Sequence, residues 1–387
     1  MRVVVTLALL AVTSWALSWA LAAPARAADP TFPSSAGDIR VETVARGLVH
    51  PWALAFLPDG RMLVTERPGR MRIVARDGTL SPPLSGVPKV VAQGQAGLLD
   101  VALDKGFAQN RMLYFCFNAD SGGSVHVARA ELDAGAAPKL DDVRVIFRQQ
   151  GPPSPGGLNL ACRIAQGADG NLFVSLGDHF KPRDEAQNLA NHIGKIVRIA
   201  PDGAAPPDNP FVGKSRQESA GAKPEIWSYG HRNAEGLAFN PADGKLWEQE
   251  HGPQGGDEIN IVAKGKNYGW PVIGFGVDYG GAKIHESTAK PGMEQPVWHW
   301  TPSIAPSGMA FYTAELFPAW KGSLFNGALK FELLSRLTLD GDKVVTEERL
   351  LQGLHERIRD VRQGPDGALY LLTDNSAGRI LRLVPAK

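Results

Sequence analysis

The chain has 387 residues, with 41 lysines and arginines against 40 aspartates and glutamates, so its formal net charge is +1. This balance argues against recognition of nucleic acid by bulk charge, which needs a basic excess. Hydrophobic residues make up 43% of the chain and charged residues 21%, which excludes a highly charged disordered protein. The 43 glycines and 29 prolines follow no collagen-like period and indicate many tight turns between short strands.

Residues 1–27 are predicted to be a secretory signal peptide. Arg2 precedes an apolar run over 3–23, and the sequence Ala-Arg-Ala at 25–27 fits the small-x-small rule for cleavage. An uncleaved membrane anchor is the alternative, because the run approaches the length that spans a bilayer. No later segment has 18 uninterrupted apolar residues, so we expect a mature chain, 28–387, that has no membrane span and is periplasmic or secreted.

A degenerate repeat runs through the mature chain. Each copy has an apolar strand, a turn that is often of the Pro-Asp-Gly kind, a second apolar strand and a polar loop. The six copies begin with the apolar runs at 52–56, 99–103, 163–165, 236–239, 308–311 and 360–362. An Asp-Gly turn between runs of period two is a strong hairpin signal, and the spacing of roughly 45–75 residues is typical of propeller blades with insertions. We therefore predict a single all-β domain, a six-bladed β-propeller, in which strand 40–44 completes the last blade beside 379–383.

Two other architectures fit this pattern less well. A β-sandwich would require the Asp-Gly turns to be accidental. An α/β barrel would need amphipathic helices between the strands, and only residues 184–189 look helical.

The mature chain keeps two cysteines, Cys116 and Cys162. An oxidising compartment would allow them to pair, but a sequence gives no distance between them. The sequence therefore does not decide whether the two cysteines form a disulfide or remain two buried thiols.

Several cationic side chains are expected to meet at one end of the propeller. The common hydrolase motifs Gly-x-Ser-x-Gly and His-Glu-x-x-His are missing, and no closely spaced histidine pair indicates a zinc site. Polar, glycine-rich segments remain at the blade ends, where loops converge on the central channel. Arg232, Lys330, Arg357 and Arg359 would meet there and favour an anionic ligand, although each alone also fits a solvated charge at a strand end.

Five of these segments carry a resemblance to a known family. They read Gly-His-Arg-Asn at 230–233, His-Gly-Pro-Gln-Gly-Gly-Asp-Glu-Ile-Asn at 251–260, Asn-Tyr-Gly-Trp-Pro at 267–271, Ala-Leu-Lys at 328–330 and Arg-Ile-Arg-Asp-Val at 357–361. In combination they resemble the soluble quinoprotein sugar dehydrogenases of the glucose/sorbosone dehydrogenase group, and most closely the periplasmic aldose sugar dehydrogenases. The resemblance spans about 41–383. It implies a six-bladed propeller that binds pyrroloquinoline quinone (PQQ) and calcium, oxidises aldoses at C1 to lactones and passes the electrons to an external acceptor.

The resemblance also implies roles for individual residues. Those that would hold the carboxylates and carbonyl oxygens of PQQ, or lie beside them, are Gln95, Arg232, Asn233, Lys330, Arg357 and Arg359. The backbone carbonyls of Gly252 and Pro253 would bind the calcium next to PQQ, since calcium prefers oxygen donors. Glu258 and Tyr268, supported by Asp257, would form a second calcium site, for which an acidic turn without metal is the alternative.

One position departs from the family pattern. The catalytic histidine of the family lies in a His-Phe-Gly-Ser/Gly-Arg motif, whereas this chain has Asn-Leu-Ala-Cys-Arg at 159–163, with Asn159 in the place of the histidine. An asparagine amide does not titrate near neutral pH, and loss of a general base costs ~10²–10⁴ in rate. The departure leaves three interpretations open: a weak or inactive PQQ binder, a base supplied elsewhere, or a local shift of the alignment.

Two histidines are candidates for a substitute base. His179, in Leu-Gly-Asp-His, is the better one, although an ordinary loop histidine fits as well. His231 is poorer, because family members carry it besides the catalytic histidine. Trp298 and Trp300 are expected either to stack on a sugar or to pack within a blade.

Three functions are therefore considered. The first is the PQQ- and calcium-dependent oxidation of aldoses. The second is a non-catalytic propeller that binds PQQ or a carbohydrate. The third, calcium-dependent lactone hydrolysis, is supported least, because the cations suit a polyanionic cofactor better than a neutral lactone. A Cys-x-x-Cys-His haem motif is missing, so any electron acceptor must be external.

Overall fold

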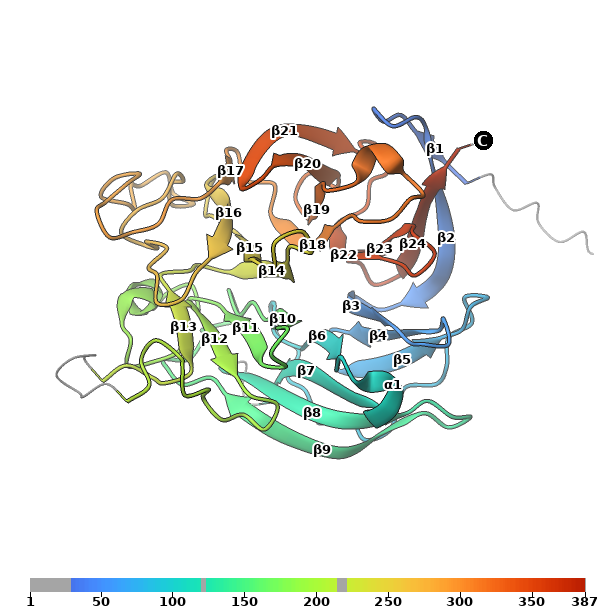
Figure 1. Cartoon of the computed structure of the whole chain (residues 1–387), viewed down its shortest axis with the longest axis horizontal. Helices are drawn as coiled ribbons and strands as arrows, with labels where there is room; N and C mark the ends of the chain where they lie inside the picture. Colours follow the sequence, from blue (N-terminus) through green and yellow to red (C-terminus); the bar gives the residue numbers. More distant parts are fainter. Residues whose placement is uncertain (1–28, 120–122, 214–220, 387) are drawn as a thin grey trace, which may run out of the picture.

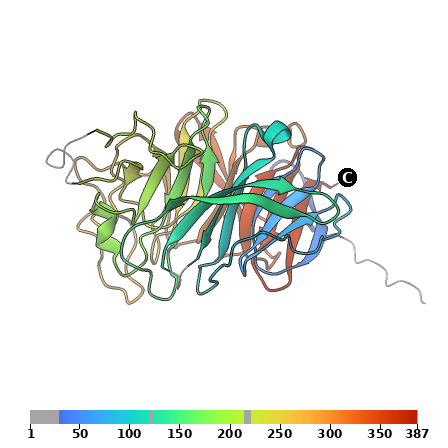
Figure 2. The ribbon, with the colours of Figure 1, turned by 90° about the horizontal axis from the view of Figure 1, so that it is seen from below.

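The described residues form six small antiparallel sheets arranged around a central axis, as a six-bladed β-propeller (Figure 1). The computed structural model of the chain describes residues 29–119, 123–213 and 221–386, so the predicted signal peptide at 1–27 lies outside them. In the view turned by 90° (Figure 2) the sheets stand next to one another across the width of the molecule.

In each of the first five blades, the strands follow one another in the order of the chain. Blade 1 consists of β3 (Pro51–Phe56), β4 (Met62–Glu66) and β5 (Arg70–Val74). Blade 2 consists of β6 (Leu98–Leu103), β7 (Met112–Asn118), β8 (Val125–Asp133) and β9 (Lys139–Arg148). Blade 3 consists of β10 (Ile164–Gln166), β11 (Leu172–Leu176), β12 (Lys195–Ile199) and β13 (Ile226–Tyr229).

The second half of the ring follows the same pattern. Blade 4 consists of β14 (Ala234–Phe239), β15 (Leu246–Glu250), β16 (Asp257–Val262) and β17 (Trp298–Trp300). Blade 5 consists of β18 (Pro306–Phe311), β19 (Leu324–Ala328), β20 (Leu334–Asp340) and β21 (Lys343–Leu350). Blade 6 consists of β22 (Ile358–Gln363), β23 (Leu369–Thr373), β24 (Gly378–Pro385), β2 (Ile39–Leu48) and β1 (Thr31–Phe32). The described helical segments are short: α1 (Phe107–Asn110) and the 3₁₀ turns η1 (Arg183–Gln187) and η2 (Pro318–Trp320).

The predicted repeat is confirmed strand by strand. Each of the six copies forms the two inner strands of one blade, and the inner strands of successive blades contact one another around the ring. The predicted closure is also confirmed, because β2 pairs with β24 and places Val41 opposite Leu383. The helical stretch expected at 184–189 is largely the turn η1.

The Asp-Gly turns explain part of the glycine excess. Gly60 and Gly170 both have φ of +83°, a conformation that glycine adopts without steric cost. In the first turn the Asp59 carboxylate accepts a hydrogen bond from the Arg61 N–H at 3.0 Å. The turn residues therefore fix the hairpin that the sequence pattern predicts.

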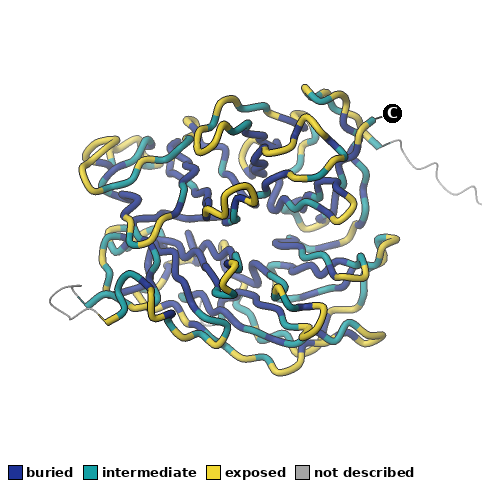
Figure 3. Tube along the Cα trace, viewed as in Figure 1, coloured by how far each residue is buried: buried dark blue, intermediate teal, exposed yellow. Residues whose placement is uncertain are grey.

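The core lies between the faces of neighbouring blades. Trp247 of blade 4 meets Phe311 of blade 5 edge to face, with ring centroids 5.6 Å apart. Buried residues follow the strands of every blade, whereas exposed ones concentrate in the connecting segments (Figure 3). Trp298 and Trp300 belong to this packing: Trp300 is 2% exposed and its Nε1–H donates to Glu347 at 2.8 Å. Of the two roles expected for these tryptophans, the structure shows packing, and Trp300 packs between blades 4 and 5.

The structure pairs the two cysteines. Cys116 on β7 and Cys162, just before β10, form a disulfide with Cα atoms 6.5 Å apart, within the usual range for such bonds. The bond links blade 2 to the entry of blade 3. In the described part of the chain, no helix is long and apolar enough to cross a lipid bilayer.

Candidate active site

A cavity of about 390 Å³ lies where the inner strands begin, and we call it the cation pocket. Its lining includes the second residue of each of four inner strands, namely Trp52, Leu99, Glu235 and Arg359. The remaining lining residues come from loops: Gln95, Ala161, His251, Tyr279, Ala305, Leu329, Lys330 and Arg357. The structure therefore brings Gln95, Lys330, Arg357 and Arg359 together, as the convergence of blade-end loops predicts.

The three cations of the pocket differ in how they are paired. Arg359 donates to Glu235 at 3.1 Å and to Asp374 at 2.6 Å. Arg357 donates to the Leu329 carbonyl at 2.9 Å and lies 3.8 Å from Asp374. Lys330 forms no ion pair with any described residue. Two carboxylates thus face three cations, and the ammonium group of Lys330 is available for an anionic ligand.

Asp374 is fixed as a carboxylate beneath these arginines. Burial alone would raise its pKa, but the charge and hydrogen bond of Arg359, together with the His50 ring, hold the pKa well below its usual value. His50 Nδ1 lies 2.8 Å from the Asp374 carboxylate. The arginine side chains are therefore held by a permanently charged partner before any ligand binds.

Arg232 and Asn233 lie beside the cation pocket without lining it. Arg232 lines an adjoining cavity of about 320 Å³, and Tyr279 lines both cavities. The Arg232 guanidinium donates to the His251 carbonyl at 2.8 Å and stands over the Trp270 ring at 5.2 Å. Asn233 is fully buried and its amide donates to Glu235 at 3.2 Å. The four cations expected to meet are thus divided, with three in one cavity and Arg232 in the next.

Asn159 is held rigidly next to the cation pocket. Its backbone N–H donates to Gln95 Oε1 at 2.7 Å, and its side-chain Nδ2–H donates to Asp178 Oδ1 at 2.9 Å. No described residue donates a hydrogen bond to its Oδ1 atom, which is free to accept one. Asn159 itself is 5% exposed, and it contacts the lining residue Gln95 without lining either cavity itself.

The segment that contains Asn159 has an unusual backbone. Asn159, Ala161 and Cys162 have φ of +49°, +52° and +110°, a region that side chains other than asparagine and aspartate rarely adopt. The family motif carries glycine, or glycine and serine, at the positions of Ala161 and Cys162. This chain adopts the conformation without glycine at these positions, and the disulfide of Cys162 ties the segment to β7.

His179 lines neither cavity. Its Nδ1 lies 2.7 Å from the Pro152 carbonyl and its Nε2 lies 3.0 Å from Gln149 Oε1. Burial lowers its pKa to about 4, only partly offset by the hydrogen bond to Pro152. Both ring nitrogens face carbonyl oxygens, which only accept, so the neutral imidazole donates to one of them through its single N–H and faces away from the cation pocket.

Comparisons with known proteins decide the family. The profile of the family described as Glucose / Sorbosone dehydrogenase matches residues 48–382. The aldose sugar dehydrogenase YliI of Escherichia coli is 46% identical over 355 residues, which are 90% of this chain and 93% of that protein. The chain belongs to the glucose/sorbosone dehydrogenase family.

Solved structures of this family superpose closely. The soluble aldose sugar dehydrogenase of Escherichia coli in its apo form has a TM-score of 0.85 and 46% identity, and the match covers 90% of this chain and all of that one (100%). The PQQ-bound aldose sugar dehydrogenase of Streptomyces coelicolor has a TM-score of 0.74 and 31% identity, covering 91% of this chain and 99% of that one. The expected family and fold are therefore both confirmed.

The carbonyls that the family resemblance assigns to calcium are free in this member. No described residue donates a hydrogen bond to the carbonyl oxygen of Gly252 or Pro253, and Pro253 lines the cavity shared with Arg232. The Asp257 carboxylate shapes this loop, since it accepts from the Gly252 N–H at 2.8 Å and from the Ile304 N–H at 2.7 Å. Two unpaired carbonyl oxygens on a braced loop suit a calcium ion.

Glu258 and Tyr268, to which the resemblance assigns a second calcium ion, are both buried. Burial raises the pKa of Glu258 to about 8, with Glu248 and Asp257 adding to the effect. The Tyr268 hydroxyl donates to the Ile261 carbonyl at 2.6 Å and accepts from the Ala263 N–H at 2.7 Å. The hydroxyl thus donates its one proton and accepts one hydrogen bond.

Eight of the twelve residues that line the cation pocket were not among the predicted site residues, and four of these eight have polar or aromatic side chains. Trp52 lies under the Arg163 guanidinium at 4.0 Å and near that of Arg359 at 5.7 Å. His251 and Glu235 stand within or next to segments that carry the family resemblance, so their place in a motif was the available signal. Tyr279 lies in the long connection between β16 and β17, which has no periodicity from which its position could be predicted.

Proposed function

We propose that this protein is a PQQ- and calcium-dependent dehydrogenase that oxidises aldoses at C1 to lactones and passes the electrons to an external acceptor. The observation that carries the proposal is the cation pocket, in which Lys330, Arg357 and Arg359 surround a cavity of about 390 Å³ beside Gln95. Its volume lies in the usual range of small-molecule sites. An excess of cationic side chains over carboxylates suits a ligand with several carboxylates.

The residues of the pocket fit PQQ. The exposed Lys330 ammonium forms no ion pair with any described residue and lies 5.4 Å from the Phe331 ring centroid. The buried Nε–H groups of Arg359 and Arg232 have no hydrogen-bond partner among the described residues. Unpaired buried donors are costly unless a ligand satisfies them. Lys330, Arg357 and Arg359 would hold the acidic groups of PQQ, with Gln95 alongside, and Arg232 would approach from the adjoining cavity.

The loop at Gly252 and Pro253 would hold the calcium ion. Neither carbonyl accepts a hydrogen bond from a described residue, and Pro253 lines the same cavity as Arg232 and Tyr279. A calcium ion bound there would act as a Lewis acid toward a cofactor oxygen, and PQQ would supply the acceptor for the hydride removed from sugar C1.

The role of Asn159 is to orient rather than to remove a proton. Its amide donates to Asp178, which leaves Oδ1 to accept a hydrogen bond from a sugar hydroxyl. An amide cannot take the hydroxyl proton at neutral pH, so we expect slow turnover. A non-catalytic propeller that binds PQQ or a carbohydrate is the second candidate, and the amide at this position is the observation that favours it.

We propose a periplasmic or secreted location. The predicted leader at 1–27 supports it, and so does the disulfide between Cys116 and Cys162, because disulfides persist in oxidising compartments.

Reconstitution of the purified mature chain tests the proposal. The chain is loaded with PQQ and Ca²⁺, and dye reduction is followed with a panel of aldoses. The proposal expects tight PQQ binding with slow dye reduction. Binding of PQQ without any dye reduction would establish the second candidate, a non-catalytic propeller. Failure to bind PQQ would refute both the dehydrogenase and the PQQ-binding propeller.

A further inference from the structure

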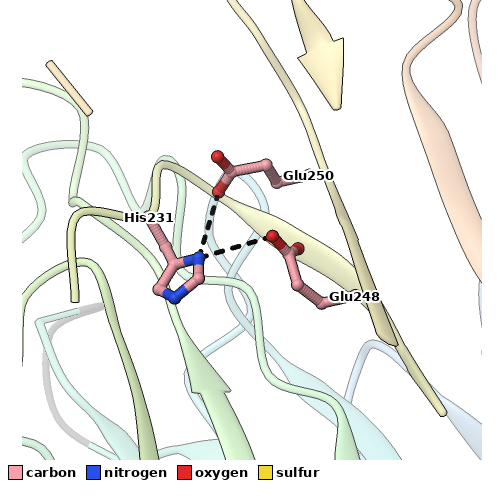
Figure 4. A group of neighbouring side chains, drawn as sticks. All are labelled: His231, Glu248 and Glu250. Atoms are coloured by element: carbon pink, nitrogen blue, oxygen red, sulfur yellow. Dashed lines mark ion pairs between the residues drawn. The ribbon is translucent and has the colours of Figure 1, made fainter. Parts of the chain in front are cut away.

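Three buried ionisable side chains meet at the inner side of blade 4, namely His231, Glu248 and Glu250 (Figure 4). Glu248 and Glu250 project from β15, and His231 comes from the segment between β13 and β14. His231 and Glu248 are 0% exposed and Glu250 is 3% exposed. One ligand atom from each lies within 4.8 Å of the other two. The cluster therefore forms a compact set of nitrogen and oxygen donors that solvent does not reach.

The spacing within the cluster is not that of hydrogen bonds. His231 Nδ1 lies 3.4 Å from Glu248 Oε1 and 3.9 Å from Glu250 Oε2, beyond the usual donor–acceptor distance of about 2.7–3.2 Å. His231 Nδ1 and Glu248 Oε2 have no hydrogen-bond partner although both atoms are buried. With metal–ligand distances of about 2.0–2.1 Å, neighbouring ligands of a tetrahedral ion lie roughly 3.4 Å apart. The observed separations are close to those that an ion between the three atoms would require.

Three buried carboxylates lie close together in this part of blade 4. Glu258 lies opposite Glu250 in the β15–β16 pair, so three carboxylates share one face of the sheet. Within the described residues, none of the three forms an ion pair with a lysine or arginine. Their hydrogen bonds come from neutral groups: Asn260 donates to Glu248 and Glu258, and the Arg232 backbone N–H donates to Glu250. Burial of carboxylates without a cationic partner is unfavourable, and a divalent cation would reduce this cost.

The imidazole of His231 is oriented toward the carboxylates. Its Nε2 lies 2.8 Å from Ser228 Oγ, and its ring stacks on Tyr268 with centroids 4.7 Å apart. If Nε2 donates to the Ser228 hydroxyl, the lone pair of Nδ1 points at Glu248 and Glu250. A metal-binding histidine is commonly held in this way, by a hydrogen bond from its other ring nitrogen.

We propose that His231, Glu248 and Glu250 form a buried binding site for one divalent transition-metal ion, for which Zn²⁺ is the probe. The imidazole nitrogen favours a borderline ion of this kind over calcium, which prefers oxygen ligands. The ligand set is distinct from the Gly252 and Pro253 carbonyls and from the Glu258 and Tyr268 pair that the family resemblance assigns to calcium.

The ion would brace the cofactor side of blade 4. Glu250 Oε2 accepts a hydrogen bond from the Arg232 N–H at 2.6 Å, so the ligand carboxylate also holds the backbone of a proposed PQQ-binding residue. The cluster is closed to solvent, which is the arrangement of a structural rather than a catalytic metal site.

Metal titration tests this proposal independently of PQQ and of enzymatic activity. The mature chain is stripped with a chelator, transferred into excess Ca²⁺ to occupy calcium sites, and titrated with Zn²⁺ by calorimetry. Bound metal is counted by elemental analysis after desalting, and a Co²⁺-loaded sample is examined by X-ray absorption for imidazole scattering. We expect one tightly held Zn²⁺ per chain in excess Ca²⁺, one imidazole ligand, and a higher melting temperature with zinc than without.

The variants separate this site from others. Glu248→Gln and His231→Gln should each weaken zinc binding at least about 10-fold. Glu225→Gln is the matched control, because Glu225 lies 3.3 Å from His192 in a similar pair elsewhere in the fold, and it should bind zinc as the wild type does. If the cluster variants fail to fold, the stoichiometry and X-ray absorption of the wild type decide the question. The proposal would be overturned if calcium displaces the zinc or if the zinc is lost on desalting. It would also be overturned if a folded Glu248→Gln variant binds zinc with wild-type affinity.

Discussion

Replacing Asn159 by histidine tests how the site is built around this residue. Asn159 Nδ2 donates to Asp178 Oδ1 at 2.9 Å, and Asp178 also accepts from the Trp270 Nε1–H at 2.8 Å. An imidazole at position 159 can donate Nδ1–H to the same carboxylate. Its Nε2 would then be an oriented base, as in other pairs of histidine and aspartate.

The size of the effect follows from the missing proton acceptor. A positioned general base contributes ~10²–10⁴ in rate, so we expect Asn159→His to raise kcat at least about 100-fold. The partner carboxylate is already in place, because Asp178 is 1% exposed and fixed by hydrogen bonds from Asn159, Trp270 and the Phe180 N–H. The substitution therefore needs no further change in the site.

The assay is steady-state dye reduction by PQQ- and Ca²⁺-loaded protein over a series of aldose concentrations. Asn159→Gln is the matched control, since it keeps an amide and adds no titratable group. The histidine variant should also acquire a pH dependence of kcat near neutrality that the wild type and the glutamine control lack. Unchanged or lower kcat in a folded, PQQ-loaded Asn159→His variant would refute this interpretation of the position.

Three further predictions concern the cation pocket, the disulfide and the buried histidine. Lys330→Met should weaken PQQ binding ~10–100-fold, the worth of a charge-assisted hydrogen bond. It should leave the melting temperature unchanged, because the Lys330 ammonium has no ion pair to lose. Arg359→Met should lower both the affinity for PQQ and the melting temperature, since Arg359 is paired with Glu235 and Asp374. Replacing Cys116 and Cys162 together by alanine should lower the free energy of unfolding by about 2–4 kcal/mol in denaturant titrations, because the bond closes a separation of 46 residues; equal stability of the variant and the wild type would contradict this. For His179 the pKa of about 4 in the folded chain lies below the ordinary value of 6.5. As the pH falls, the unfolded chain therefore takes up the proton first, and the free energy of unfolding decreases between pH 6.5 and 4. This decrease in the free energy of unfolding amounts to about 2 kcal/mol between pH 7 and 5. His179→Gln should remove that part of the pH dependence of urea unfolding and leave the pH profile of kcat unchanged.

The fold was accessible from the sequence because its signals are local. Each blade begins with a hairpin, and residues such as Asp59 and Gly60 specify the turn by their own conformational preferences. The closure of the ring through residues near Val41 and Leu383 is a long-range contact, yet it followed from counting an unpaired strand at each end of the chain.

The site was accessible only in part. The convergence of Lys330, Arg357 and Arg359 followed from their places at blade ends. The division of the cations between two cavities did not, because it depends on Tyr279, which comes from a long irregular connection. The cluster of His231, Glu248 and Glu250 was also missed, since its members approach through the pairing and packing of two blades rather than through a spacing in the sequence.

The central claim is that the cation pocket holds PQQ, and an equilibrium titration measures it most directly. Apo protein in excess Ca²⁺ is titrated with PQQ, and binding is followed by calorimetry and by the absorption of the cofactor. The account predicts one PQQ per chain, with an affinity that falls ~10–100-fold in Lys330→Met. A wild-type chain that binds no PQQ, or one whose affinity for PQQ is insensitive to Lys330, would contradict it.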